Sequence, residues 1–271
     1  MQPNFNSSLK PYCQPNRRTR SGFVPPTKDR RLKALGVTEP KTLATKISIQ
    51  DAEKAWIPTR TPESGDWLDS YNHGGQGFDK FGGKAFSNSF NTLYLQPITH
   101  DKGSKITDDL LGKLQKWCQA FYFPCKVVVL DRISDKVLKS NRRIDTQKND
   151  FGETQFNAIH ILKEVISPIQ QRQPNCIGVL SLTDVDLFTK CLSNYCFGYG
   201  IPAYGGVQSI RRYMPDFTDE HFSCEKDFQH ALLMRVCKIG AHELGHMFGL
   251  MHCIYYQCLM MGTTHIGQTD R

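Results

Sequence analysis

The sequence predicts an α/β domain preceded by an N-terminal extension. From residue 91 onward, apolar runs rich in β-branched residues alternate with segments of helical periodicity. A long segment from about Glu225 keeps an apolar stripe at helical spacing. Residues 1–88 instead carry Pro25-Pro26, several Asn and Ser, and a glycine cluster at residues 72–83. We therefore expect an extension over residues 1–88 and a folded domain over residues 89–271.

The expected elements follow one another in the order of a βαβ unit and its continuation. Strands are predicted from apolar, β-branched composition at residues 91–98, 126–133 and 175–188, with two shorter ones within 194–201 and 205–213. Helices are predicted from periodicity at residues 110–123, near 154–165 and from about 225. The glycines at 198, 200, 205 and 206 are compatible with turns as well as with strands.

Composition limits the classes of protein that this chain can represent. Its 271 residues are 39% hydrophobic, which is enough for a core, and no run approaches 18 consecutive apolar residues. We expect no membrane span and no secretory signal, and hence a cytoplasmic or nuclear location. In such a reducing compartment, the ten cysteines are expected to act as core residues or metal ligands.

The net charge of +8 is concentrated near the N-terminus. Ten Lys and Arg stand against two acidic residues through residue 46, so this segment accounts for the whole excess. Clusters such as Arg17-Arg18 and Arg30-Arg31 are compatible with nucleic-acid contact or a nuclear address. Aromatic residues are sparse there, and we favour a solvated basic face over nucleic-acid contact. We do not expect nucleic acid to be the main partner.

The run HELGHMFGLMHC at residues 242–253 carries the functional signal. On a helix, His242 and His246 lie one turn apart on the same face, so both imidazoles can point at one metal ion. A turn at Gly249 would bring His252 back as a third ligand. Three protein ligands leave a zinc coordination position open for water, as in catalytic sites, and Glu243 is placed to take that water's proton. A buried triad of metal-free histidines is the alternative, but it would need separate hydrogen-bond partners for each ring.

The motif continues with Cys253, Cys258 and Met260, and in this form it resembles the archaemetzincins, a branch of the metzincin metallopeptidases. The resemblance implies a metzincin-like mixed twisted sheet with backing helices and an active-site helix. It also implies that Met260 lies in a turn beneath the zinc. The segment 194–201 would be the edge strand to which a peptide substrate adds.

The cysteine pattern departs from this family at one point. The family pattern closes with a CxxC that completes a second, structural zinc site, and no CxxC follows Met260 here. We expect Cys253 and Cys258 to be a partial second site within a shortened C-terminal subdomain, so that one catalytic zinc is bound. A composite site that adds Cys191 and Cys196 is the alternative.

These observations favour a zinc metallopeptidase that hydrolyses peptide bonds with a zinc-activated water and Glu243 as general base. The rival is a zinc-binding but catalytically weak or inactive form that acts as an interaction protein. Peptides or proteins are the expected substrates. The amino-acid sequence does not predict the preferred substrate or the oligomeric state.

Overall fold

The computed structural model describes residues 22–36, 54–71, 74–81, 90–190, 194–202, 204–218 and 220–270. The chain divides into two compact units. The first unit comprises Met1–Gln14 and Ala85–Phe248, and the second comprises Pro15–Lys84 and Gly249–Arg271. The expected division between residues 88 and 89 stays a prediction. None of the helices in the described ranges combines the length and apolar character needed to cross a membrane.

A mixed sheet forms the centre of the first unit, as predicted. Its strand order is β2 (Lys126–Val129), β1 (Thr92–Thr99), β6 (Cys176–Thr183), β9 (Gly205–Ser209) and β8 (Gly198–Ile201). All neighbours are parallel except β8, which runs antiparallel to β9 and lies at one edge. The short β3 (Ile133–Ser134) also pairs with β1. The fold class expected from the sequence is therefore confirmed.

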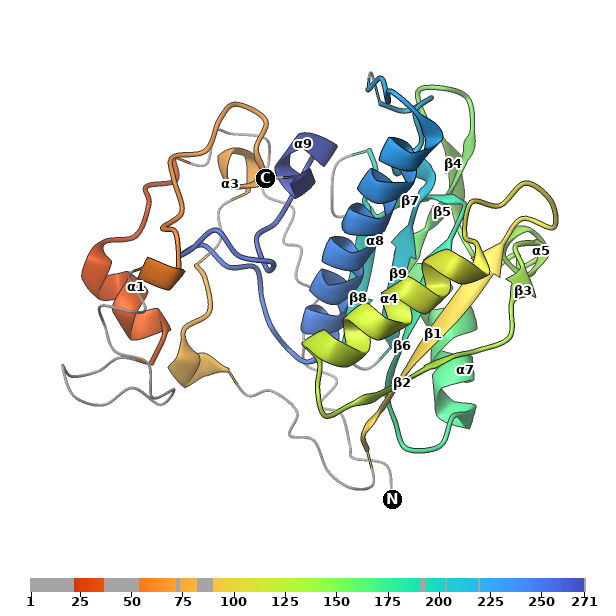
Figure 1. The fold of residues 1–271 in the computed structure, drawn as a ribbon, viewed down its shortest axis with the longest axis horizontal. Coiled ribbons are helices and arrows are strands. Elements are labelled where there is room, and N and C mark those ends of the chain that lie inside the picture. Colours follow the sequence, from red (N-terminus) through yellow and green to blue (C-terminus); the bar gives the residue numbers. More distant parts are fainter. Residues whose placement is uncertain are drawn as a thin grey trace. The chain divides into compact units, whose positions relative to one another are not determined.

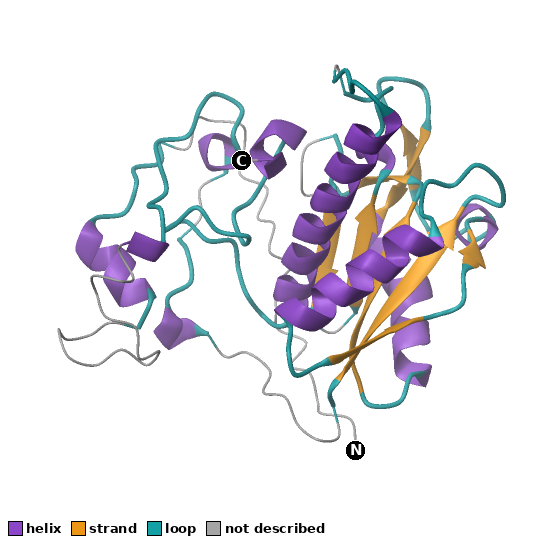
Figure 2. Ribbon diagram, viewed as in Figure 1, coloured by secondary structure: helices purple, strands orange, loops and turns teal. Residues whose placement is uncertain are grey.

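Helices cover both faces of this sheet, so β1 is buried along its whole length. Helices α4 (Asp108–Phe121) and α8 (Glu225–Met247) lie across one face, as Figures 1 and 2 show. The other face packs on α6 (Ala158–Ile161), the π-helical turn η2 (Leu162–Ile166) and α7 (Ser167–Arg172). Alternate strand residues divide accordingly: Tyr94 and Val179 join the cluster on the α6 side. Leu180 points the other way, toward Gly240 of α8.

Three predicted elements have different limits in the structure. The strand expected at 126–133 is interrupted between β2 and β3. The helix expected from residue 154 begins at Ala158, because β5 (Thr154–Asn157) precedes it and the Asn157 side chain caps its first turn. The strand expected at 175–188 ends at Thr183 and resumes as β7 (Asp186–Phe188) in another sheet.

That second sheet contains three short strands, β4 (Thr146–Lys148), β5 and β7. β4 is antiparallel to β5, and β5 is parallel to β7. The short helix α5 (Lys136–Lys139) lies between β3 and β4 in the chain, and the 3-10 turn η3 (Arg211–Tyr213) follows β9. The predicted strand 205–213 therefore ends at Ser209.

The described residues of the second unit form short elements, α1 (Lys28–Ala34), α3 (Trp67–Ser70), the 3-10 turn η1 (Phe78–Lys80) and α9 (Ile266–Asp270). Trp67, Leu68 and Ile254 form its small buried core. A β-bridge between Pro58 and Tyr256 joins the N-terminal part of this unit to its C-terminal part.

Candidate metal centre and active site

Helix α8 begins at Glu225, as predicted, and its last two turns carry the motif histidines. His242 and His246 are both buried, and their Nε2 atoms lie 3.0 Å apart. Two imidazole nitrogens bound to one tetrahedral zinc at about 2.1 Å would be separated by about 3.4 Å. The pair is thus close to the geometry of two ligands of a single ion.

Glu243 lies between these histidines in sequence and faces the edge strand β8. Its side chain is buried, and burial raises the pKa of its carboxyl group to about 8 despite a hydrogen bond from the Gly200 backbone N–H. Its Oε2 atom has no hydrogen-bond partner among the described residues. A buried carboxyl oxygen without a partner is suited to accept a proton from a bound reactant.

Strand β8 comes very close to α8 because two of its residues are glycines. Gly198 and Gly200 occupy alternate positions and face the helix, whereas Tyr199 between them packs on the opposite face of the sheet. A Cβ atom at Gly198 would lie 2.7 Å from Glu243 Cγ, and one at Gly200 would lie 3.1 Å from His246 Cβ. These glycines therefore serve close approach rather than a turn.

The C-terminal end of α8 is fixed by groups that the sequence motif did not indicate. The Tyr122 hydroxyl, from the residue after α4, donates to the carbonyl oxygen of Ala241 at 2.5 Å. The Tyr122 ring also stacks on Phe248, with 5.2 Å between ring centroids. Gly249 follows with a φ of 93°, a left-handed conformation typical of the residue that ends a helix. The turn expected at Gly249 is present.

The remaining predicted site residues belong to the second unit. The His252 ring packs edge-on against Trp67, with ring centroids 4.4 Å apart. The backbone N–H of Cys253 donates to the carbonyl oxygen of Met260 at 2.7 Å, which closes a turn. A hydrogen bond from Cys258 holds the pKa of the Cys253 thiol below its ordinary value.

Cys191, which the alternative composite zinc site requires, lies outside the described residues. Tyr256, beside the third histidine in sequence, is buried and packs near Trp56. Its ring has a packing role in the second unit.

Residues 143–271, which include the motif and its flanking strands, match the model of peptidase family M54. Archaemetzincin-2 of Rattus norvegicus is 26% identical over 255 residues, which cover 83% of this chain and 68% of that protein. Archaemetzincin of Pyrococcus furiosus is 34% identical over 122 residues, which cover 45% of this chain and 59% of that protein. The chain is thus similar to the archaemetzincins, and its C-terminal part matches their peptidase family.

A solved structure of a zinc-dependent peptidase from Methanocorpusculum labreanum is also similar, with a TM-score of 0.49 at 21% identity. The alignment covers 66% of this chain and 92% of that one. These similarities support a zinc metallopeptidase, with peptides or proteins as its substrates.

Proposed function

We propose that this protein hydrolyses peptide bonds at one zinc ion held by His242, His246 and His252, with Glu243 as general base. The observation that carries the proposal is the buried set on α8: two ring nitrogens 3.0 Å apart, with a carboxylate beside them whose Oε2 has no partner among the described residues. Zinc, when bound, supplies a Lewis acid that polarises the substrate carbonyl and lowers the pKa of water.

The choice of His252 as third ligand rests on its place in the chain. It is four residues beyond Phe248, so the connecting chain spans at most about 14 Å. The left-handed residue Gly249 ends the helix and redirects the chain before His252. Beside His242 and His246, His252 would supply the third imidazole ligand of a catalytic zinc site.

Glu243 is proposed to transfer a proton from the attacking water to the leaving group. Its carboxylate would take a proton from the attacking water and deliver it to the amine nitrogen of the leaving group. Burial favours this role because a carboxylate removed from bulk water is a stronger base than one on the surface, consistent with its raised pKa.

Strand β8 is proposed to bind the substrate as an additional strand. Its outer edge has no neighbouring strand among the described residues, and its glycines lie against Glu243 and His246. An extended peptide paired with this edge through main-chain hydrogen bonds would therefore run past the general base. We propose one zinc per chain, because Cys253 and Cys258 supply only two thiolates and closed structural zinc sites use four ligands.

The test combines zinc analysis of the purified protein with a peptide-library digest. Glu243→Gln should keep about one zinc per chain and lose roughly a hundredfold or more in turnover, since the amide keeps the shape but cannot accept a proton. His246→Ala should lose stoichiometric zinc. Glu225→Gln and His230→Ala, at exposed positions of the same helix, are the matched controls. Full turnover by the Glu243→Gln protein would refute the general-base role, and a full zinc content in His246→Ala would refute the ligand assignment.

A further inference from the structure

A cavity of about 1160 Å³ lies at the end of α8 that is remote from the motif. It is lined by residues that follow β1, β6 and β9, among them His100, Asp184 and Ile210, and by Phe228 in the first turn of α8. Phe228 and His246 are 18 residues apart on one helix, which corresponds to about 27 Å. The cavity is therefore separate from the histidines of the motif, and an inference about it is independent of the proposed function.

Its position follows from the order of the strands. The chain leaves the carboxyl end of β1 toward β2 on one side, whereas the chain after β6 leads toward β9 on the other. Connections that diverge in this way open a crevice at the carboxyl ends of adjacent parallel strands, where open α/β sheets bind their ligands. The cavity lies at this switch point, because His100 follows β1 and Asp184 follows β6.

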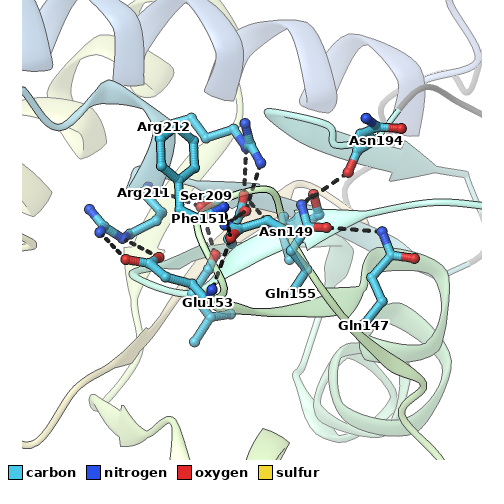
Figure 3. Close-up of polar contacts among 12 residues, drawn as sticks. Gln147, Asn149, Phe151, Glu153, Gln155, Asn194, Ser209, Arg211 and Arg212 are labelled. Carbon is cyan, nitrogen blue, oxygen red and sulfur yellow. Dashed lines mark hydrogen bonds and ion pairs between the residues drawn. The ribbon is translucent and has the colours of Figure 1, made fainter. Parts of the chain in front are cut away.

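Most charged groups of the cavity wall are already paired. Arg211 binds both Glu153 and Asp216, and Figure 3 shows its pairing with Glu153. The side chains of His100 and Lys139 both contact Asp135. An anionic ligand would have to displace one of these carboxylates from its cation, so the wall is poorly suited to anions.

Asp184 is the acidic group of the cavity wall that forms no ion pair with a described residue. The residue is only 6% exposed, and its Oδ2 accepts a hydrogen bond from the backbone N–H of His100 at 3.0 Å. That is its one hydrogen bond among the described residues, and no described cation forms an ion pair with it. A buried carboxylate without a counter-charge, on the wall of a cavity, favours a cation inside that cavity.

The wall beside these groups is aromatic. Phe222 and Phe228 line the cavity and meet edge to face, with ring centroids 5.5 Å apart. The ammonium group of Lys105 already lies 5.9 Å from the centre of the Phe228 ring. This surface therefore accommodates an alkyl chain that ends in a positive charge.

We propose that this cavity binds an organic cation, an ammonium or guanidinium group on an apolar chain, with the charge at Asp184 and the chain against Phe222 and Phe228. Two sources offer this chemistry: a free polyamine, or a basic side chain on a peptide. Spermidine and N-acetyl-lysine amide represent them as probes.

The test is calorimetric titration of the zinc-loaded full chain with each probe. Binding of either probe should saturate at one per chain. Asp184→Asn should weaken binding about tenfold, which is the loss expected when one hydrogen bond to a charged group is removed. Asp150→Asn removes the same charge from an exposed position and should bind as the parent does. Saturable binding of spermidine alone would assign a free amine, and binding of the lysine amide would assign a basic side chain.

The proposal fails if neither probe saturates the parent or if Asp184→Asn binds either probe as tightly as the parent. Hydrogen exchange of the parent gives a second measurement that does not depend on how the variant folds. The bound probe should slow exchange at residues 184–186 and 220–228. Binding that leaves exchange at these residues unchanged would also overturn the assignment.

Discussion

The backbone of Gly198 lies against the carboxyl group of Glu243, with no room for a side chain between them. A Cβ atom at residue 198 would lie 2.7 Å from Cγ and 2.8 Å from Cδ of Glu243, closer than real Cβ contacts. The edge strand and the active-site helix are therefore in contact at the residue proposed to move the proton. Changes at Gly198 should affect catalysis through the position of this carboxylate.

Gly198→Ala is expected to lower peptidase turnover while zinc stays near one per chain. The added methyl group must displace the Glu243 side chain or move β8 away from α8, and overpacking of this kind costs about 1–3 kcal/mol of folding stability. Turnover and zinc content of the same preparation, with its melting temperature, would measure both effects.

Gly112→Ala is the matched control, because Gly112 lies within α4 and a Cβ there meets nothing within 4 Å. Replacement of a helical glycine by alanine should raise stability by about 0.5–1 kcal/mol and leave turnover unchanged. Full activity in the Gly198→Ala protein would mean that this contact does not position Glu243.

Local sequence signals predicted the elements that position the site. The strand at 91–98 and the helix from about 225 correspond to β1 and α8, because a buried β-branched run and a long periodic segment each specify one structure. Helical spacing alone was enough to predict that the motif residues His242, Glu243 and His246 lie close together. The helix start at Ala158 was missed because it depends on a cap by Asn157 after a short strand.

Local sequence signals could not predict contacts between segments that are far apart in the sequence. β4 was not predicted, since all three of its residues are exposed and its pairing with β5 supplies the only indication of a strand. The sequence left open whether Gly198 and Gly200 belong to a turn or a strand. Their role depends on the approach of β8 to Glu243 and His246, which are more than 40 residues away in the chain. The position of Asp184 likewise depends on the loop after β1.

Asp135→Asn should destabilise the protein by about 1–3 kcal/mol near neutral pH. Burial disfavours the Asp135 carboxylate, but hydrogen bonds from Lys139 and His100 outweigh that effect and hold its pKa below the ordinary value. A lowered folded pKa contributes stability above the unfolded pKa of about 3.9, and this stability is lost as the pH falls through the folded pKa. The difference between parent and variant should thus be constant above about pH 5 and shrink below about pH 4.

Urea unfolding at several pH values would test this. Asp101→Asn is the control, because Asp101 also pairs with a lysine, Lys136, but at an exposed position. Its stability should be close to that of the parent. An Asp135→Asn deficit that persists unchanged to pH 2 would contradict the role of the charge.

Arg212→Met is expected to destabilise the first unit by about 3–5 kcal/mol, because it leaves a buried carboxylate without its cation. The Nε and one Nη of Arg212 each donate to Asp186 at 2.8 Å, and Asn149 donates to the same carboxylate. The side chain of Asp186 is only 1% exposed. Figure 3 shows Arg212 and Asn149 among the polar contacts of this region.

The guanidinium of Arg212 also lies 3.7 Å from the centre of the Tyr195 ring, three residues before β8. Arg212→Lys should recover only part of the stability, since an ammonium group cannot form the two-point contact. Chemical unfolding of the two variants, compared with Arg142→Lys at an exposed position, would measure the difference. Equal stability of the Lys and Met variants would show that the ion pair is unimportant.

Removal of zinc should make stability fall as the pH rises, through Glu243. In the metal-free protein, burial raises the pKa of this carboxyl to about 8, above its unfolded value near 4.3. The folded state then holds a proton that the unfolded state has released, so stability declines between about pH 4 and pH 8 by a few kcal/mol and is level above that range. Glu243→Gln should remove this decline, leaving the metal-free variant more stable than the metal-free parent at pH 8. The stability of the zinc-loaded parent should depend less steeply on pH, because the positive ion favours the carboxylate form of Glu243.

Thermal unfolding from pH 5 to pH 9 would measure the stability of three proteins: the zinc-loaded parent, the metal-free parent and metal-free Glu243→Gln. Identical pH profiles for the two metal-free proteins would exclude Glu243 as the origin of the decline.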